Sequence, residues 1–488
     1  MNRKILILIL IFAAALAIRV YQLSIFEYKN DQYFAILLGN DTRNSHFLVT
    51  HGMLSGVGVN NPPAFLYIMG LLTGFTNDPF YLTFFFFGIN ILALALAMFY
   101  FYRTLPGIYA ILSSAFLALF PAFTFYSSNI WAQCLLPLIM IILNINLYKF
   151  IKYGNSWNFF AAFILTALAA QLHMSGFFIF PALLIILIYR WNKVDKRTIG
   201  AAIFLSFLLF VPYLIHLFLE NGLHKIISYG ASFKRDIPWK VFPAHIRMSS
   251  FDFFRYYFKH DFNSVLRGAA GLWSFVLYPL TFIPAALFVF GFLSYLKWLI
   301  KGRRFFSLDD DINKRYPLPF QICGLLITVV TLGYLVLRVR TPMHYFILLF
   351  PAYSLITGFA AFKAWKTYWG KLTVLLGIIS TVFLLAGVLI FLDKAGGHPH
   401  EYGISYKELI SWRKDIQSAV SKGACFNVKA NFTGKGKADK EVTEAVLSDK
   451  NGCRAGTKPI PVEINIGWNS KTMRYEHSIH WREPLERF

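Results

Sequence analysis

Stretches of about 20 mostly apolar residues, the length an α-helix needs to cross a bilayer, recur along most of this chain. Hydrophobic residues make up 57% of the 488 positions and charged residues 15%, whereas a soluble domain carries about 25% charged residues. We therefore predict an all-α polytopic membrane protein with about eleven transmembrane helices. The predicted spans are approximately 4–24, 79–102, 108–126, 131–150, 158–172, 176–191, 199–219, 270–298, 318–337, 343–362 and 372–392.

The first apolar stretch and one short stretch need separate interpretation. Arg3 and Lys4 precede the first stretch, as in a signal peptide, but residues 19–22 make a poor small-residue cleavage site, so we expect a retained span. Residues 63–73 are apolar but too short to cross. They predict an interfacial or re-entrant juxtamembrane helix on the outer side.

Basic residues in alternate short loops set the predicted orientation. By the positive-inside rule these loops are cytoplasmic, as is the N-terminus, whereas the first outer loop (25–78), a large outer loop (220–268) and the C-terminal tail lie outside. The cytoplasmic set is Arg3, Lys4, Arg103, Lys149, Lys152, Arg190, Lys193, Lys196, Arg197, Lys301, Arg303, Arg304, Lys314, Arg315, Lys363, Lys366 and Lys371.

The net charge of +23 does not predict nucleic-acid binding here, because the positions of the charges follow the membrane topology. The 220–268 loop is basic although it is predicted to lie outside, and it includes Lys234 and Arg235. This pattern favours an anionic partner for the loop. A solvated loop that meets anionic lipid headgroups is the alternative.

The chain divides by composition into a transmembrane domain (1–392) and an extracytoplasmic domain (393–488). The tail is rich in Lys, Glu, Gly and Asn, and residues 459–467 alternate like a strand, so we predict a small α/β domain. Four cysteines are too few for a disulfide scaffold. Cys425 and Cys453 in the tail could form one disulfide, whereas Cys134 and Cys323 are predicted to be small core residues.

Candidate polar residues gather in the first outer loop. Asp31 and Gln32 follow the first span, and an ionised carboxylate there could accept a proton from a hydroxyl or bind a divalent cation. A helix cap is the alternative role for Asp31. Gln32, Tyr33, Asp41 and Arg43 are candidate substrate-binding residues of this loop. His46 and His51 match no zinc-site spacing and favour a polar loop over a metal site.

A second group of candidates lies at other outer loops. Arg338 and Arg340 suit a phosphate group, because guanidinium offers a fork of donors to phosphate oxygens. Contact of these arginines with lipid headgroups is the alternative. Further substrate-binding candidates at this face are His173, which with Gln171 would line an outer cavity, Glu220, which a helix C-cap explains almost as well, His344 and Tyr345.

The chain contains no Walker loop, dinucleotide-binding glycine motif, G-x-S-x-G elbow or CxxC pair. Nucleotide-dependent chemistry therefore has no sequence signature here. Because the polar candidates face away from the cytoplasm, an enzyme with this layout needs an activated group already carried across the membrane. A lipid phosphate carrier is the obvious vehicle.

The ordered landmarks of residues 1–360 resemble the GT-C superfamily of membrane glycosyltransferases, of the bacterial protein-mannosyltransferase and ArnT-like kind. The landmarks are Asp31-Gln32-Tyr33-Phe34, Asn61-Pro62-Pro63 with residues 64–67, residues 121–137 with Tyr126, Asn129 and Trp131, Gln171-Leu172-His173, Pro212-Tyr213 through Glu220-Asn221-Gly222, and His344-Tyr345-Phe346 with Pro351. The resemblance implies a GT-C fold with outer juxtamembrane helices.

The resemblance also implies a reaction. Such enzymes transfer sugars from polyprenyl-phosphate donors, such as undecaprenyl phosphate sugars, with inversion at the outer face of the bacterial inner membrane. By the resemblance Asp31 is the general base, and Arg338 and Arg340 hold the carrier phosphate. Many members have Asp-Glu where this chain has Asp-Gln, so a divalent metal on Asp31 is possible but lacks its second acid.

We therefore predict a glycosyltransferase acting on a cell-envelope glycan: a lipopolysaccharide or O-antigen unit, or lipid A. Alternatives are an O-antigen polymerase or ligase that uses lipid-diphosphate donors, and a protein O-mannosyltransferase. A flippase is disfavoured because the predicted span interiors carry almost no charge. The expected partners are membrane lipids, the lipid-linked sugar and the acceptor, and no oligomeric state is predicted.

Overall fold

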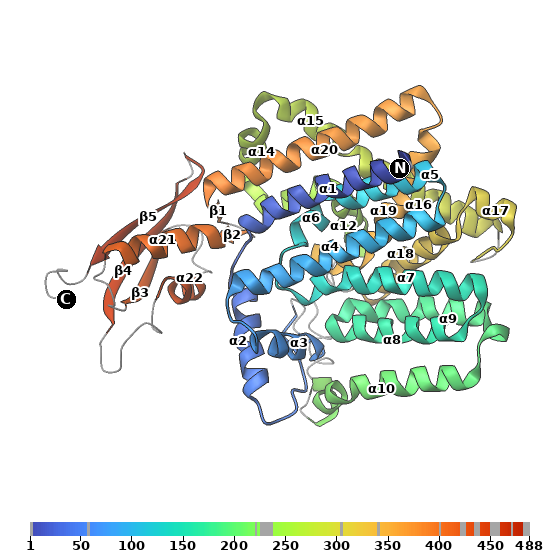
Figure 1. Ribbon diagram of the computed structural model, residues 1–488, viewed down its shortest axis with the longest axis horizontal. Coiled ribbons are helices and arrows are strands. Elements are labelled where there is room, and N and C mark those ends of the chain that lie inside the picture. Colours follow the sequence, from blue (N-terminus) through green and yellow to red (C-terminus); the bar gives the residue numbers. More distant parts are fainter. Residues whose placement is uncertain are drawn as a thin grey trace. The chain divides into compact units, whose positions relative to one another are not determined.

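The computed structural model describes residues 3–55, 59–219, 222–224, 238–302, 306–338, 342–399, 402–419, 426–433, 440–448, 459–469 and 472–481. Within them most of the chain is helical (Figure 1). The longer α-helices are α1 (Arg3–Ser24), α2 (Asn30–Asn44), α3 (Ala64–Thr73), α4 (Pro79–Thr104), α5 (Gly107–Leu119), α7 (Leu136–Tyr153), α8 (Ser156–Leu172), α9 (Phe180–Tyr189), α10 (Lys196–Leu219), α16 (Ile283–Gly302), α18 (Leu318–Leu337), α19 (Phe350–Ala364), α20 (Tyr368–Ala395) and α21 (Tyr406–Ala419).

Short helices connect them. The short α-helices are α6 (Pro121–Tyr126), α12 (Val241–Met248), α13 (Phe253–Phe258), α14 (Phe262–Ala270), α15 (Ser274–Leu280), α17 (Asp310–Arg315) and α22 (Lys440–Leu447). The 3-10 helices are η1 (Ala132–Leu135), η2 (Met174–Ile179), η3 (Trp191–Lys193), η4 (Pro238–Lys240), η5 (Lys259–Asp261), η6 (Gly271–Trp273) and η7 (Met343–Leu349).

Eight helical segments of the described chain are long and apolar enough to cross a membrane. Three other predicted spans correspond to the shorter apolar helices Gly107–Leu119, Ser156–Leu172 and Met174–Tyr189. The predicted short helix at 63–73 is α3, which is ten residues long. The prediction of an all-α polytopic membrane protein is confirmed.

Prolines break two stretches that were predicted as single spans. The predicted span 108–126 is divided into α5 and α6, because Pro121 supplies no N–H to continue the helix and Phe120 is extended. The predicted span 270–298 is divided into α15 and α16 around Thr281, with Pro279 and Pro284 on either side. At such a break the chain can change direction between two helices without a long polar loop.

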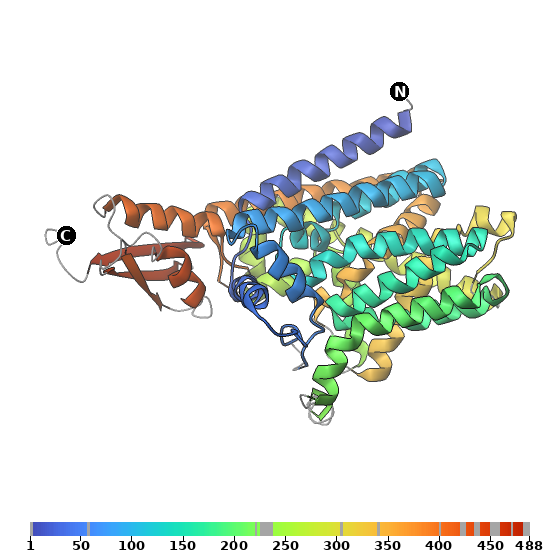
Figure 2. The same cartoon turned by 60° about the horizontal axis from the view of Figure 1, so that its bottom comes forward.

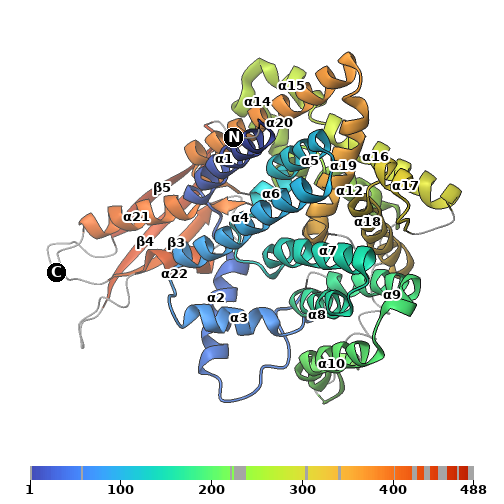
Figure 3. The same cartoon turned by 45° about the vertical axis from the view of Figure 1, so that its right-hand side comes forward.

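The described chain forms two compact units, and the first comprises residues 1–19, 35–253 and 277–382. Its helices pack side by side, with α7 beside α4, α8 and α18, and α10 beside α8 (Figures 2 and 3). Helix α19 is buried along nearly its whole length against α5, α16 and α18. Gly358 permits this, because a Cβ there would lie only 2.1 Å from Ser113 Oγ of α5.

The second unit comprises residues 20–34, 254–276 and 383–488. It contains the hairpin-like pair β1 (Gly397–His398) and β2 (Gly403–Ile404) and a three-stranded sheet of β3 (Phe426–Thr433), β4 (Ile460–Asn469) and β5 (Arg474–Trp481). Strand β4 pairs parallel with β3 and antiparallel with β5, and α22 packs on β3. The predicted small α/β domain and its strand at 459–467 are confirmed, whereas the boundary at 392/393 stays a prediction.

Two sequence interpretations need comment. The stretch 220–268, which was predicted as an outer loop, contains α12, α13 and the start of α14, because its apolar residues have partners to bury against (Val241, Phe253, Phe254 and Phe258 are buried). Cys134 and Cys323 are buried, as expected of core residues. Cys425 and Cys453, and with them the predicted disulfide, lie outside the described residues.

Candidate functional site

Asp31 lies in the first turn of α2, immediately after the connection from α1. Its side chain is exposed, whereas the neighbouring Gln32 is only 1% exposed. A carboxylate in the first turn interacts favourably with the partial positive charge of the helix N-terminus. Asp31 is therefore placed as an accessible anion beside the end of a membrane-spanning helix.

A second acid in the same turn was missed from the sequence. Glu27 is 1% exposed, and its Oε2 lies 3.5 Å from Lys29 Nζ. Gln32 completes the arrangement: its Nε2 donates to Glu27 Oε1 over 3.5 Å, and its Oε1 accepts from the backbone N–H of Lys29 at 3.2 Å. Gln32, predicted to bind substrate, thus binds Glu27. The sequence signal for Glu27 was an acid followed at i+2 by a lysine directly after a span.

The C-terminal part of the second unit holds this turn from the other side. Tyr402 donates its hydroxyl hydrogen to the carbonyl of Ile25, and the Tyr406 N–H donates to the carbonyl of Phe26 at 3.1 Å. Glu27 and Ser405 form an antiparallel bridge. Burial raises the pKa of Tyr402 well above its usual 10, and the charges of Glu27 and Asp393 raise it further, so the hydroxyl stays a donor.

A chain of imidazole and aromatic rings, here called the histidine cluster (His51, His173, His216 and His344), lies within the first unit. The ring of His173 meets the ring of Tyr345 edge-on at 4.5 Å, and His344 lies 4.8 Å from Tyr345. Trp131 follows at 5.5 Å from His344. The structure thus brings His173 together with His344 and Tyr345, which were predicted from a different outer loop.

His173 is held as a neutral ring. Its Nδ1 accepts from the Ser175 N–H at 3.2 Å and lies 2.7 Å from Ser175 Oγ, so the neutral ring carries its proton on Nε2. Burial and, to a smaller extent, the charge of His344 together lower the pKa of His173 to about 3. Near neutral pH His173 therefore acts as a hydrogen-bonding group and not as a cation.

The other half of the histidine cluster joins the first outer loop to α10. The rings of His51 and His216 stack with centroids 4.3 Å apart, and His216 Nε2 lies 3.5 Å from Asn60 Nδ2. Tyr213 donates to the carbonyl of Asn60 at 2.8 Å. Asn61 connects the two halves, because its Oδ1 accepts from the N–H of Met174 at 3.4 Å.

The remaining predicted residues lie as follows. Tyr33 is half-buried with its ring 5.7 Å from Phe34, Asp41 is exposed on α2, and Arg43 donates to the carbonyl of Thr73 at 2.9 Å. Arg338 is exposed at the C-terminus of α18 with a φ of 51°, an uncommon conformation for a residue other than glycine. Outside the described residues lie Glu220, Lys234, Arg235 and Arg340.

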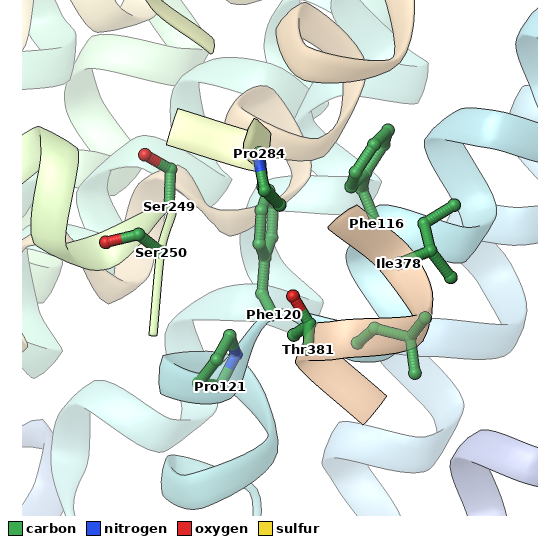
Figure 4. Close-up of a pocket in the computed structure, with 9 residues that line it drawn as sticks. Phe116, Phe120, Pro121, Ser249, Ser250, Pro284, Ile378 and Thr381 are labelled. Carbon is green, nitrogen blue, oxygen red and sulfur yellow. The ribbon is translucent and has the colours of Figure 1, made fainter. Parts of the chain in front are cut away.

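An enclosed space in the first unit is lined by Phe120, Pro121, Ser249, Ser250 and Thr381, among others (Figure 4). Its volume is about 10 Å³, enough for about one water molecule. Each of the three hydroxyls also has a backbone partner: Ser249 and Thr381 donate to carbonyls, and Ser250 accepts from the Asp252 N–H. A space of this size cannot hold a sugar.

Within the described ranges, no three His, Cys, Asp or Glu side chains gather as a metal site. His46 is exposed, and His51 stacks on His216 instead of pairing with His46.

Comparison with known proteins gives structural neighbours only. No family model and no curated protein sequence matches the chain. Among solved structures, ArnT from Cupriavidus metallidurans bound to undecaprenyl phosphate is similar, with a TM-score of 0.48 and 10% identity over 95% of this chain and 93% of that chain. An oligosaccharyltransferase from Archaeoglobus fulgidus has a TM-score of 0.46 and 13% identity over 93% of this chain and 62% of that one.

These neighbours are of the kind that the sequence landmarks resemble. At this identity and score, the similarity assigns no residue role and no substrate to this chain. The chemistry must come from the described side chains themselves: one accessible carboxylate at the end of a span, and a buried group of neutral imidazole, amide and phenol donors. Such groups suit the hydroxyls of a sugar and the oxygens of a phosphate ester.

Proposed function

We propose that this protein transfers a sugar from a polyprenyl-phosphate carrier to an acceptor hydroxyl at the outer face of the cytoplasmic membrane. The observation that carries the proposal is the contrast between two acids of one turn. Asp31 is exposed at a helix N-terminus, whereas Glu27 is buried and paired with Lys29. Only Asp31 of this pair is accessible to a substrate hydroxyl.

The reaction is a single displacement with inversion. The acceptor oxygen attacks C1 of the donor sugar, and the bond between C1 and the carrier phosphate oxygen breaks. Asp31 takes the proton of the attacking hydroxyl, and the polyprenyl phosphate leaves with the bonding electron pair. A base held within hydrogen-bond reach of the attacking group supplies typically about 10²- to 10⁴-fold in rate.

The leaving phosphate gains negative charge as the bond breaks, so cations near it favour the transition state. Arg338 is the described candidate for this role; Arg340, Lys234 and Arg235 are proposed with it from the sequence. Its place at the C-terminus of α18 suits a cation, because the helix dipole is negative there. The leaving phosphate and the negative end of the helix would then both attract the guanidinium of Arg338.

The acceptor class is the finer part of the proposal. We favour a lipopolysaccharide, O-antigen or lipid A hydroxyl over a protein hydroxyl, in a bacterial inner membrane, with Tyr33, Asp41, His173, His344 and Tyr345 as substrate contacts. Aromatic rings and neutral donors, as in His173 and Tyr345, suit a sugar better than they suit a charged peptide. Undecaprenyl phosphate sugars, named for the carrier in the ArnT structure, are the first donors to test.

The cellular test compares three strains: one with the protein, one without it, and one with Asp31→Asn. Mass spectrometry of surface glycans and lipid A should show a sugar that is present in the first strain and absent from the other two. Asp311→Asn, at an exposed acid of α17, is the control and should retain the sugar. Equal glycan profiles with and without the protein would exclude the proposed function.

A further inference from the structure

Helices α2 and α3 form an open groove of about 410 Å³ within the first unit. The two helices cross closely at glycines: a Cβ on Gly39 would lie 2.9 Å from Met69 Cβ, and one on Gly70 would lie 3.3 Å from Gly39 O. Gly70 and Gly74 leave the floor of the groove flat. The other lining residues are Thr42, Arg43, Tyr67, Leu71 and Phe75.

One wall of the groove is apolar and exposed. Tyr67, Leu71 and Phe75 follow at intervals of four residues and are 38%, 65% and 83% exposed. Tyr67 and Leu71 lie on one face of α3, because residues four apart on a helix are neighbours, and Phe75 follows in the turn just after the helix ends. The three residues are here called the apolar stripe. Tyr67 also donates to the carbonyl of Val49 at 2.7 Å, which fixes a loop segment with the exposed Phe47 beside α3.

The groove carries a single cation in a fixed position. Arg43 Nη1 donates to the carbonyl of Thr73 at 2.9 Å, and its Cδ lies against Gly74, since a Cβ there would be 3.7 Å away. Among the described residues, no carboxylate forms an ion pair with Arg43. Its Nε also donates to Asn44 Oδ1 at 3.4 Å, so Nη2 and the second hydrogen of Nη1 are the donors that remain for an anion at the edge of the apolar stripe.

We propose that this groove binds the headgroup of an anionic phospholipid, with the phosphate on Arg43 and the first acyl carbons along Tyr67, Leu71 and Phe75. An apolar stripe that borders a cation matches an amphiphile with a negative head. A helix of ten apolar residues is too short to cross and lies at the membrane interface, where such headgroups are found.

The number of cations decides between two lipid classes. A phosphodiester, as in phosphatidylglycerol, carries one negative charge, which one guanidinium matches. A phosphomonoester, as in polyprenyl phosphate, carries about −1.5 to −2 near neutral pH and would leave charge uncompensated on Arg43 alone. The site is thus assigned to an anionic phospholipid and not to the free carrier phosphate. The sugar-loaded carrier is itself a phosphodiester with one negative charge, and the binding experiment distinguishes it from the phospholipid. The assignment does not depend on the proposed transfer reaction.

The experiment is native mass spectrometry of the full-length purified protein titrated with phosphatidylglycerol, phosphatidylcholine, undecaprenyl phosphate or an undecaprenyl phosphate sugar. We expect phosphatidylglycerol to bind about tenfold more tightly than phosphatidylcholine. Arg43→Gln should abolish that preference, and Leu71→Gln should weaken both phospholipids with Arg43 intact. Arg103→Gln, at an exposed cation in the last turn of α4, is the matched control and should change nothing.

Three results would overturn the assignment. Equal binding of the two phospholipids to the wild-type protein would remove the role of charge. An unchanged preference in Arg43→Gln would place the anion site elsewhere. Displacement of phosphatidylglycerol by a lower concentration of undecaprenyl phosphate or of the undecaprenyl phosphate sugar, lost in Arg43→Gln, would make the groove a carrier site.

Discussion

Glu27 and Lys29 form an ion pair in which the carboxylate is almost fully buried and lies 3.5 Å from the ammonium. Removing one partner of such a pair leaves a buried charge uncompensated, which typically costs about 3 kcal/mol or more. We predict that Glu27→Gln lowers the thermal stability of the purified protein. Fluorescence-detected unfolding measures this, with the exposed Glu441→Gln as control. A Glu27→Gln protein as stable as the wild type would show that the ion pair does not contribute to thermal stability.

Tyr402 holds the same turn through the carbonyl of Ile25. Tyr402→Phe removes one hydrogen bond worth about 1 kcal/mol, so amides of residues 25–33 should exchange with deuterium roughly fivefold faster. Hydrogen-exchange mass spectrometry of the full chain measures the change. Tyr368→Phe, at an exposed tyrosine of α20, should leave the exchange of this segment as it is. Unchanged exchange in Tyr402→Phe would show that the turn is held elsewhere.

Gly176 lies where η2 touches α8. A Cβ at Gly176 would lie 2.4 Å from both the carbonyl carbon of Ala169 and the nitrogen of Ala170, so Gly176→Ala must push η2 away and move Ser175, the partner of His173. We predict a loss of about 2 kcal/mol in stability. The matched control is Gly200→Ala in α10, where a Cβ meets nothing within 4 Å and should stabilise by about 0.5 kcal/mol. Equal stabilities for the two variants would contradict the close packing.

Two buried histidines predict how stability depends on pH. Burial lowers the pKa of His173 and that of His245 to about 3, from the usual 6.5. His245 binds Tyr353 Oη at 2.5 Å and Thr331 Oγ1 at 2.8 Å as a neutral ring. Between pH 6.5 and about pH 3 the unfolded chain therefore binds more protons than the folded protein.

Stability is complete above about pH 6.5 and falls with pH below it, by up to about 1.4 kcal/mol per pH unit for each histidine. Unfolding curves of the purified protein at a series of pH values measure this slope. His173→Gln and His245→Gln should each flatten it, whereas the exposed His46→Gln should not. The same slope in all variants would mean that other groups cause the acid sensitivity.

The sequence predicted the helices better than their interruptions. The predicted span 318–337 coincides with α18, since a long apolar run has few other ways to satisfy its backbone. The same apolar pattern does not show where Pro121 divides α5 from α6. The pattern also does not predict the burial of Arg19. This residue of α1 is fully buried and donates to the carbonyl of Ala118 at 2.7 Å, just before that break.

The candidate site was predictable in part. Asp31 stands out because an acid beside a span is rare, and histidines at separate outer loops indicate one face of the membrane. Glu27 did not stand out, because its burial depends on residues 402–406, nearly 380 positions away in the sequence. The pairing of His51 with His216 is hidden for the same reason, since only folding brings the first outer loop to α10.

The most direct test of the proposed function is sugar transfer by the purified protein from an undecaprenyl phosphate sugar to the acceptor found in the cellular test. Asp31→Asn keeps the size of the side chain but cannot take a proton. We expect kcat to fall by at least about a hundredfold, with unchanged thermal stability. Asp311→Asn should retain full activity. Full transfer activity in folded Asp31→Asn protein would contradict the role of Asp31 as the base.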